Sequence, residues 1–249
     1  MLNLKEWPRK GRKMSDEKKW IRALQYLEQD LILNIGMIEP IKRRTAELFY
    51  AEKDGVLLLE EKSGAYMLSV DEPELAEKLV AEIQEAKLFT AHQQFSLPMI
   101  ESRFGLPLQF KCLPAAYLNK DLLQTDERVK IDLLDGSHIQ VVLDHYHTMD
   151  DSDYITKLID QGQVYGAFVD GSLAGFIGIH LEGSIGILEV LPEFQRLGIG
   201  SELERRIVNM MLEKGWIPFC EVFEDNLTSI SLQKKLGFTI SDRCLYWFF

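Results

Sequence analysis

The chain of 249 residues lacks several features that would restrict its class. No apolar stretch reaches the ~18 residues that a transmembrane helix needs. The basic opening segment also lacks the continuous apolar core of a secretory signal. With 46% hydrophobic and 27% charged residues, the composition excludes a disordered or fibrous chain. We therefore expect a cytoplasmic protein with no membrane-bound part.

Cysteine and histidine are scarce. The three cysteines are odd in number, widely spaced and without a CxxC pair, which argues against a disulfide framework and against a zinc site. They are Cys112, Cys220 and Cys244. His145 and His147 are two residues apart and no cysteine or second histidine pair joins them, which is poor spacing for metal ligands. We expect reduced, mostly buried thiols and no metal.

The charge is unevenly distributed. Nearly all of the net charge of −11 lies in residues 127–249, whereas residues 1–14 are basic. An acidic field repels a nucleic-acid backbone and attracts an amine, although acidic charge kept for solubility explains the pattern equally well. We expect no nucleic-acid partner. Met14 resembles an alternative start, so residues 1–14 are interpreted as a flexible leader, with a nucleic-acid arm as the less favoured alternative.

The most informative segment is 185–202, which reads IGILEVLPEFQRLGIGSE. Its aliphatic first part is typical of a buried strand, which Pro192 ends. From Gly198 onward the apolar spacing becomes helical, with Glu202 and Glu204 on the expected polar face. The first N–H groups of such a helix have no partner within the helix, so they can hold a phosphate, and glycines let it come close. A plain strand-to-helix turn with a glycine kink is the alternative.

The run Gln195-x-x-Gly198-x-Gly200 resembles the pyrophosphate loop of the GNAT acyl-coenzyme A transferases. A second segment, 221–238, resembles the late strand, the Asn-containing turn and the helix ending in Leu-Gly-Phe of that family. The resemblance implies acetyl-coenzyme A as acyl donor and Asn226 as a contact of its pantetheine arm, while helix capping is the simpler role of Asn226. The expected cofactor contacts are Leu188, Val190, Gln195, Arg196, Leu197, Gly198, Ile199, Gly200, Ser201, Asn226 and Ser229.

The expected element order supports the resemblance. In the first half we predict helices over 16–33 and 73–86, and short strands over 46–51, 56–60, 65–70, 89–92 and 108–113. In the second half we predict a strand over 130–134, helices over 137–146 and 151–161, and a hairpin over 164–180 closed by Asp170-Gly171. The motif strand and its helix follow, then a strand over 217–223, a helix over 227–235 and a closing strand pair over 238–249.

These elements indicate an α/β fold with a mixed sheet, in which the second half has the GNAT fold. We place a boundary near residue 126, within a polar segment over 118–130. Residues 15–126 then form a smaller or degenerate α/β domain of unknown role, loosely similar to the extra domain of glycine N-acyltransferase-like proteins. Residues 127–249 form the acyltransferase domain.

Transfer to an amine needs a base, because an alkyl amine is protonated at neutral pH. Glu221 lies where related protein acetyltransferases carry a catalytic glutamate, so it is the candidate general base, with an exposed position on an edge-like strand as the alternative. Glu189 and Glu182 are weaker candidates. Gln233 occupies the place of the tyrosine that serves many members as general acid, and an amide cannot do so. The acid is therefore unassigned, with Tyr246 and Ser231 as weak candidates.

The acidic residues Asp144, Asp150, Asp151 and Asp153 lie where the family often borders its acceptor, although Asp151 or Ser152 is expected chiefly as a helix cap. Carbonyl polarisation is expected from backbone N–H groups near Leu188 and Val190, where the motif strand would separate from its neighbour.

The sequence thus predicts an N-acyltransferase that moves an acetyl or other short acyl group to a primary amine by direct attack in a ternary complex. One alternative is a degenerate GNAT domain that binds coenzyme A as a sensor or interaction module without turnover, and another is a scaffold whose glycine loop binds nothing. The acceptor, the acyl chain length and the oligomeric state, a homodimer included, are left open. The aromatic run 246–249 is expected to be buried.

Overall fold

The computed structural model describes residues 14–148 and 151–249. The leader predicted over 1–14 lies outside these residues except for Met14, as does Asp150 of the acidic group. In the first half the elements are α1 (Met14–Leu27), η2 (Glu28–Asp30), α2 (Ile35–Arg43), β1 (Ala46–Glu52), β2 (Gly55–Glu60), β3 (Ala65–Val70), α3 (Pro73–Glu82), β4 (Phe89–Ala91), η3 (Gln94–Ser96), α4 (Leu97–Phe104) and β5 (Leu108–Ala116).

The second half follows after a long connection. Its elements are β6 (Lys130–Leu133), η4 (Gly136–His138), α5 (Ile139–His145), α6 (Ser152–Asp160), β7 (Val164–Val169), β8 (Ser172–Ile179), β9 (Ile185–Val190), η5 (Pro192–Phe194), α7 (Ile199–Glu213), β10 (Phe219–Phe223), α8 (Leu227–Leu236), β11 (Thr239–Ile240) and β12 (Leu245–Phe248).

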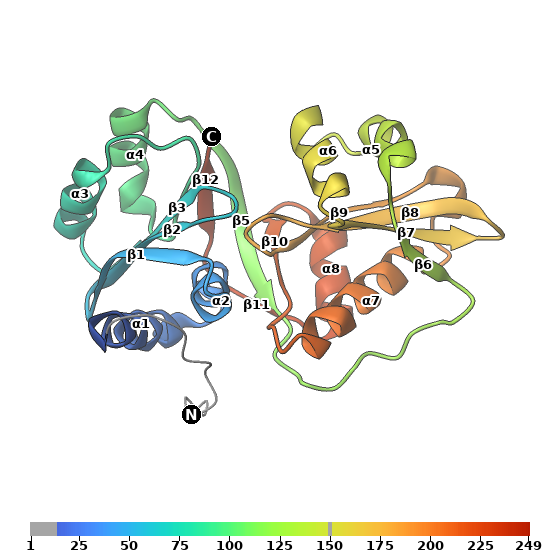
Figure 1. The fold of residues 1–249 in the computed structure, drawn as a ribbon, viewed down its shortest axis with the longest axis horizontal. Helices are drawn as coiled ribbons and strands as arrows, with labels where there is room; N and C mark the ends of the chain where they lie inside the picture. The colour runs from blue at the N-terminus through green and yellow to red at the C-terminus, as the bar shows by residue number, and fades with distance from the viewer. Residues whose placement is uncertain (1–13, 149–150) are drawn as a thin grey trace.

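The strands form one mixed sheet through both halves. Its order is β1-β2-β3-β4-β12-β5-β10-β9-β8-β7-β6, with β11 beside β5. Figure 1 shows α1 to α4 gathered around one part of this sheet and α5 to α8 around the other, with β5 passing between the two groups. The expected α/β fold with a mixed sheet is confirmed.

The last strand, β12, pairs with two strands of the first half of the chain. β12 pairs antiparallel with β4 on one side, Tyr246 opposite Ala91, and with β5 on the other, Leu245 opposite Cys112. A boundary near residue 126 assigns β12 to the second half, whereas its strand neighbours come from the first. The expected burial of the aromatic run is confirmed for Tyr246, Trp247 and Phe248, and Phe249 is half-buried.

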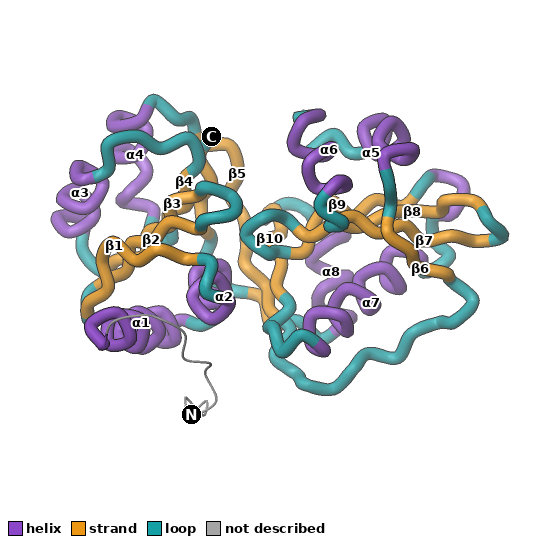
Figure 2. Tube along the Cα trace, viewed as in Figure 1, coloured by secondary structure: helices purple, strands orange, loops and turns teal. Residues whose placement is uncertain are grey.

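Two helices of the first half differ from the sequence prediction. The single helix expected over 16–33 ends at Leu27, and a separate helix, α2, begins at Ile35 and includes Pro40. Helix α4 was not predicted at all, because its short apolar segment resembles a loop. Figure 2 shows α2 lying between α1 and strand β5. This position brings α2 to the functional site described below.

Arg43, in the last turn of α2, holds the two halves together. Its side chain is mostly buried and pairs with Glu39 at 3.1 Å. Its guanidinium lies 4.3 Å from the ring centroid of Trp216, which is a cation–π contact. It also packs against Gly183 in the turn between β8 and β9, where a Cβ would overlap it. The packing of Arg43 on Gly183 holds α2 against the turn that precedes β9.

None of the helices among the described residues combines the length and apolar character needed to span a bilayer. The core consists of several apolar clusters. One cluster lies between α7, α8 and the sheet and includes Leu203, Ile207 and Met211. Another contains Phe248 together with Leu68, Phe89 and Ile100 of the first half. The core of the first half is therefore completed by residues from the other end of the chain.

Replacing Phe248 by alanine tests that completion. Phe248 is fully buried, so Phe248→Ala should lower the free energy of unfolding by about 3–5 kcal/mol, the usual loss for a buried phenylalanine. Leu122→Ala is the control, because Leu122 is 57% exposed in the connection between the halves and should change stability by less than about 0.5 kcal/mol. Urea unfolding measures both, and equal effects would contradict the packing of β12.

Candidate functional site

Strands β9 and β10 separate after a single residue pair. They run parallel and pair only at Ile185 and Cys220. Beyond that point the remaining backbone groups on this side of β9 have no strand partner. The expectation that the motif strand separates from its neighbour is therefore confirmed for β9 and β10. An opening of this kind, in the middle of a sheet, leaves N–H and C=O groups available to a ligand.

A distortion of β9 accompanies the opening. Ile187 has φ +55°, a left-handed conformation that a β-branched residue rarely adopts. The pairing of β9 with β8 shifts register between Phe176 and Gly178, and a Cβ on Gly178 would lie 2.9 Å from Ile187. Strained, bulged backbone of this kind is typical of functional sites, because it redirects the following groups. Here the groups that follow are those of Leu188, Glu189 and Val190.

A cavity of about 960 Å³ passes through the opening. The consecutive residues Cys220, Glu221, Val222 and Phe223 all line it, although neighbours on a strand point to opposite faces. The cavity therefore reaches both faces of the sheet. One face carries residues of α7 and α8, and the other carries Glu221, Trp247 and residues of the first half.

The glycine loop lies at the α7 end of this cavity. Gly198 has φ +84° and precedes the first residue of α7, so it takes a conformation suited to glycine. A Cβ on Gly198 would meet nothing within 4 Å, so the space in front of the helix start is open. The first N–H groups of α7 are thus presented to the cavity with the positive end of the helix dipole. These observations fit a phosphate group.

Most of the expected cofactor residues gather around the cavity. Those that line it are Leu188, Val190, Gln195, Arg196, Gly198, Ile199, Gly200, Ser201, Asn226 and Ser229. Leu197 does not line it and is 67% exposed. Asn226 accepts a hydrogen bond from the Ser229 N–H at 3.0 Å, so its expected capping role is confirmed. Its role toward a cofactor stays a prediction.

Glu221 occupies a central strand, and the alternative of an exposed edge position is wrong. Trp247 Nε1–H donates to Glu221 Oε2 from β12, and a Cβ on Gly36 of α2 would lie 3.2 Å from Glu221 Oε1. Burial raises the pKa of Glu221 to about 8, with Glu182 adding to the rise and the Trp247 hydrogen bond opposing it. A carboxylate with a raised pKa accepts a proton near neutral pH, which suits a general base.

The other acidic candidates lie nearby. Glu182 is buried, accepts a hydrogen bond from Ser184 Oγ and lines the cavity. Glu189 also lines it, and burial raises its pKa. Asp151 accepts from the Tyr154 N–H at 2.9 Å, which confirms the capping role, and it reaches the cavity edge. Asp144 and Asp153 do not line the cavity.

The weak candidates for the general acid lie away from the cavity lining. Tyr246 is buried in the first-half core beside Phe248. Ser231 Oγ donates to the Leu227 carbonyl at 2.7 Å within α8. Neither side chain is among the residues that line the cavity. Gln233, by contrast, is buried and lines it.

Sequence reasoning missed Glu204. The helical pattern assigned Glu202 and Glu204 to the exposed face of α7, but only 3% and 1% of them are exposed. Glu202 is paired with Arg206 at 3.1 Å, whereas Glu204 accepts a hydrogen bond from the amide of Gln233 at 2.8 Å. Burial raises the pKa of Glu204 to about 7. The occurrence of a glutamine at 233, in place of the family's tyrosine, was the one signal that pointed to this pair.

His180 is also part of the site, although no role for it was predicted from the sequence. Its Nδ1 lies 2.8 Å from the Tyr154 hydroxyl, and its ring packs on Gly186 in β9. Among residues 14–148 and 151–249, no three His, Cys, Asp or Glu side chains are arranged to hold a metal ion. The described cysteines are free, with Cys112 and Cys220 buried as expected.

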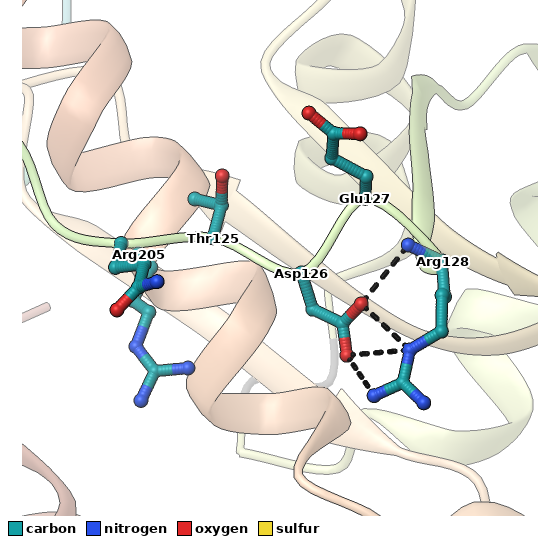
Figure 3. Close-up of a pocket in the computed structure, with 6 residues that line it drawn as sticks. Thr125, Asp126, Glu127, Arg128 and Arg205 are labelled. Atoms are coloured by element: carbon teal, nitrogen blue, oxygen red, sulfur yellow. Dashed lines mark hydrogen bonds and ion pairs between the residues drawn. The ribbon is translucent and has the colours of Figure 1, made fainter.

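A second pocket, on the connection between the halves, is shallow and separate from this site. Gln124, Thr125, Asp126, Glu127, Arg128 and Arg205 line it. Figure 3 shows Asp126 and Arg128 bonded to each other, and those bonds lower the pKa of Asp126 to about 2. Arg205 lies near Glu202, at 3.6 Å. Arg128 and Arg205 thus each have a local acidic partner, and the pocket is separate from the β9–β10 opening.

Comparison with known proteins agrees with this geometry. Residues 132–238 match the model of the acetyltransferase (GNAT) family. No curated protein matches the chain. Strands β9 and β10, the start of α7 and Glu221 lie within the matched residues, whereas Gly36 and Trp247 lie outside them.

Solved structures extend the similarity to the fold of nearly the whole chain. A Drosophila protein has a TM-score of 0.60 at 15% identity, covering 94% of this chain and 87% of that chain. For a GCN5-related N-acetyltransferase from Kribbella flavida the TM-score is 0.53 at 12% identity, and the match covers 88% of this chain and 95% of that chain. For a GCN5-related N-acetyltransferase-like protein from Streptococcus suis the TM-score is 0.51 at 13% identity, and the match covers 91% of this chain and 99% of that chain. Identities this low show the fold alone.

The buried Glu204 gives a testable pH dependence of stability. Because its pKa is raised from 4.5 to about 7 on folding, the folded state holds a proton that the unfolded state has lost between those values. The free energy of unfolding should therefore fall as pH rises from 4.5 to 7. Glu204→Gln removes this loss, so it should stabilise the protein more at pH 8 than at pH 5. Glu213→Gln, at an exposed position of α7, is the control.

Urea unfolding at the two pH values measures the difference. A Glu204→Gln variant whose stability relative to the wild type is the same at pH 5 and pH 8 would contradict the raised pKa.

Proposed function

We propose that this chain transfers an acetyl group from acetyl-coenzyme A to a primary amine, by direct attack of the amine in a ternary complex. The observation that carries the proposal is the cavity through the β9–β10 opening, with the α7 amides on one side and Glu221 on the other. The match of residues 132–238 to the GNAT acetyltransferase family supports acyl transfer from coenzyme A in general. The acetyl donor, the amine acceptor and the residue roles are the proposal.

The α7 end suits the donor. The first N–H groups of α7 and the open space at Gly198 would hold the pyrophosphate, and Asn226 and Ser229 of α8 would contact the pantetheine arm. Acetyl-coenzyme A would supply a thioester, whose carbonyl accepts an amine. Backbone N–H groups of β9 near Leu188 and Val190, on the side where β9 leaves β10, would polarise that carbonyl, as in an oxyanion hole.

Glu221 would take the proton from the amine. Its carboxylate forms above a pKa of about 8, close to neutral pH and well below the usual value of an alkyl ammonium. The hydrogen bond from Trp247 holds it in place, and Gly36 leaves room for its other oxygen, since a Cβ there would lie 3.2 Å from Oε1. The leaving thiol has an ordinary pKa of about 8.5, so its thiolate departs tolerably without a strong acid. The general acid stays unassigned.

A second candidate function is supported by Gln233. This glutamine replaces the tyrosine of many family members and is tied to Glu204, so the domain could bind acetyl-coenzyme A as a sensor without turnover. Acetyl-coenzyme A would then bind normally, yet no amine would release coenzyme A from it.

Blocking the loop tests donor binding. Gly198→Glu places a carboxylate where the phosphates are expected and should weaken acetyl-coenzyme A binding at least tenfold in calorimetry. Gly215→Glu is the matched control, since Gly215 also has positive φ, +72°, and open space around it, at the other end of α7. Both variants share the backbone strain, so only the site should differ. Equal binding by both would remove the loop from the proposal.

Replacing the base tests catalysis. With a substrate in hand, the rate of the wild type should rise with pH through about 8 and then level, because Glu221 acts as a carboxylate. Glu221→Gln should lower kcat roughly 100-fold, within the range usual for a general base, and lose that rise. Glu224→Gln, an exposed neighbour that does not line the cavity, is the control.

Trp247→Phe tests the same role of Glu221 through its pKa. It removes the hydrogen bond that lowers the pKa of Glu221, so the rise should move to higher pH while the fold is kept. A pH profile unchanged in both Glu221→Gln and Trp247→Phe would exclude Glu221 as the base.

A further inference from the structure

The cavity continues from the opening into the first half of the chain. Its lining includes Ser63, Lys87, Leu88 and Phe110, from β5 and from the connections after β2 and before β4. The GNAT family match ends at residue 238, and these residues lie before its start at residue 132. This part of the cavity is therefore built by elements outside the matched domain.

Aromatic rings form the wall of this part. Phe110 meets Phe223 edge-on, with ring centroids 4.9 Å apart, and meets Phe249 in the same manner at 5.3 Å. All three rings are half-buried and line the cavity, as does Trp247. We call Phe110, Phe223, Trp247 and Phe249 the aromatic wall. Half-buried rings around a cavity bind a flat apolar group, because such a group covers the apolar surface that they leave exposed.

The aromatic wall begins directly beside Glu221. Trp247 donates its indole N–H to Glu221, and Phe223 lies two residues along β10, on the same face as Glu221. An amine held at Glu221 would therefore place its substituent against these rings after a link of only a few atoms.

Charges around the cavity restrict the acceptor further. Carboxylates cluster near the reacting end, where Glu182 and Glu189 line the cavity with Glu221. An acceptor with a carboxylate next to its amine, such as an α-amino acid, would be repelled there. At the aromatic end the charged lining residue is Lys87, which is exposed, so the second ammonium of a polyamine would meet a cation and no carboxylate.

We propose that the aromatic wall selects an arylalkylamine as acceptor, a primary amine joined by a short link to an uncharged flat ring. The proposal rests on the proposed acetyl transfer and names the substrate class of that site. In the reaction, the amine nitrogen forms the bond to the acetyl carbon while the carbon–sulfur bond breaks. The nitrogen proton goes to Glu221, the products are the N-acetylated arylalkylamine and the thiol, and the thiolate takes up a proton from water.

Binding of three probes tests the proposal without requiring turnover. In calorimetry with coenzyme A present, 2-phenylethylamine should bind at least tenfold more tightly than spermidine or glycine. Phe249→Ala and Phe110→Ala should each weaken its binding roughly tenfold to hundredfold, the change expected from losing one buried aromatic contact. Phe49→Ala is the control, since Phe49 is 47% exposed on β1 and does not line the cavity.

Release of coenzyme A from acetyl-coenzyme A with the same three amines separates the two proposals. Faster release with spermidine or glycine than with 2-phenylethylamine, or equal binding of the three amines, would overturn the acceptor class while leaving acetyl transfer intact. Loss of 2-phenylethylamine binding in Phe49→Ala to the same extent as in Phe249→Ala would overturn the aromatic wall. Absence of acetyl-coenzyme A binding by the wild type would instead overturn the proposed function.

Discussion

The separation of β9 from β10 is the constraint on which the site depends. A parallel pair in the middle of a sheet normally continues for several residues, but here it stops after Ile185 and Cys220. The strained backbone at Ile187 and the closely packed Gly178 maintain the divergence. Because the strands diverge, one cavity can connect the start of α7 with Glu221 on the opposite face. Without the opening, a donor on the helix side could not meet an acceptor beside Glu221.

The first half of the chain takes part in the site and does not merely precede it. Arg43 packs α2 against Gly183 and Trp216, which sets Gly36 beside Glu221. β12 lies between β4 and β5 and brings Trp247 to the other oxygen of Glu221. Gly36 and Trp247, which lie outside the family match, thus take part in the burial of Glu221, and that burial raises its pKa. A fragment of this chain that begins near residue 126 would lose Gly36 from the surroundings of Glu221.

Local signals in the sequence were enough for most of the elements and for the glycine loop. Asp170-Gly171 indicated a two-residue turn, and both residues have the positive φ that it needs. Gly198 and Gly237 were placed at a helix start and a helix end, and both adopt left-handed conformations there. These features depend on a few adjacent residues, so the chain alone reveals them.

Long-range packing could not be predicted in the same way. Nothing near Leu245 indicates that β12 pairs with β4, about 150 residues earlier, because strand partners are chosen by the whole core. Glu204 looks exposed by helical periodicity, and its burial follows from Gln233 on another helix. Glu221 likewise looked like an edge residue until its strand neighbours were known. The chemistry of the site therefore depends on contacts that no single segment encodes.

A crystal structure of the full chain with a non-hydrolysable acetyl-coenzyme A analogue tests the central claim most directly. The account predicts the pyrophosphate against the N–H groups at the start of α7, and the acetyl group between β9 and β10 with Glu221 facing it from the side of Trp247. An analogue bound elsewhere, or β9 and β10 closed into a continuous parallel pair in the complex, would contradict it.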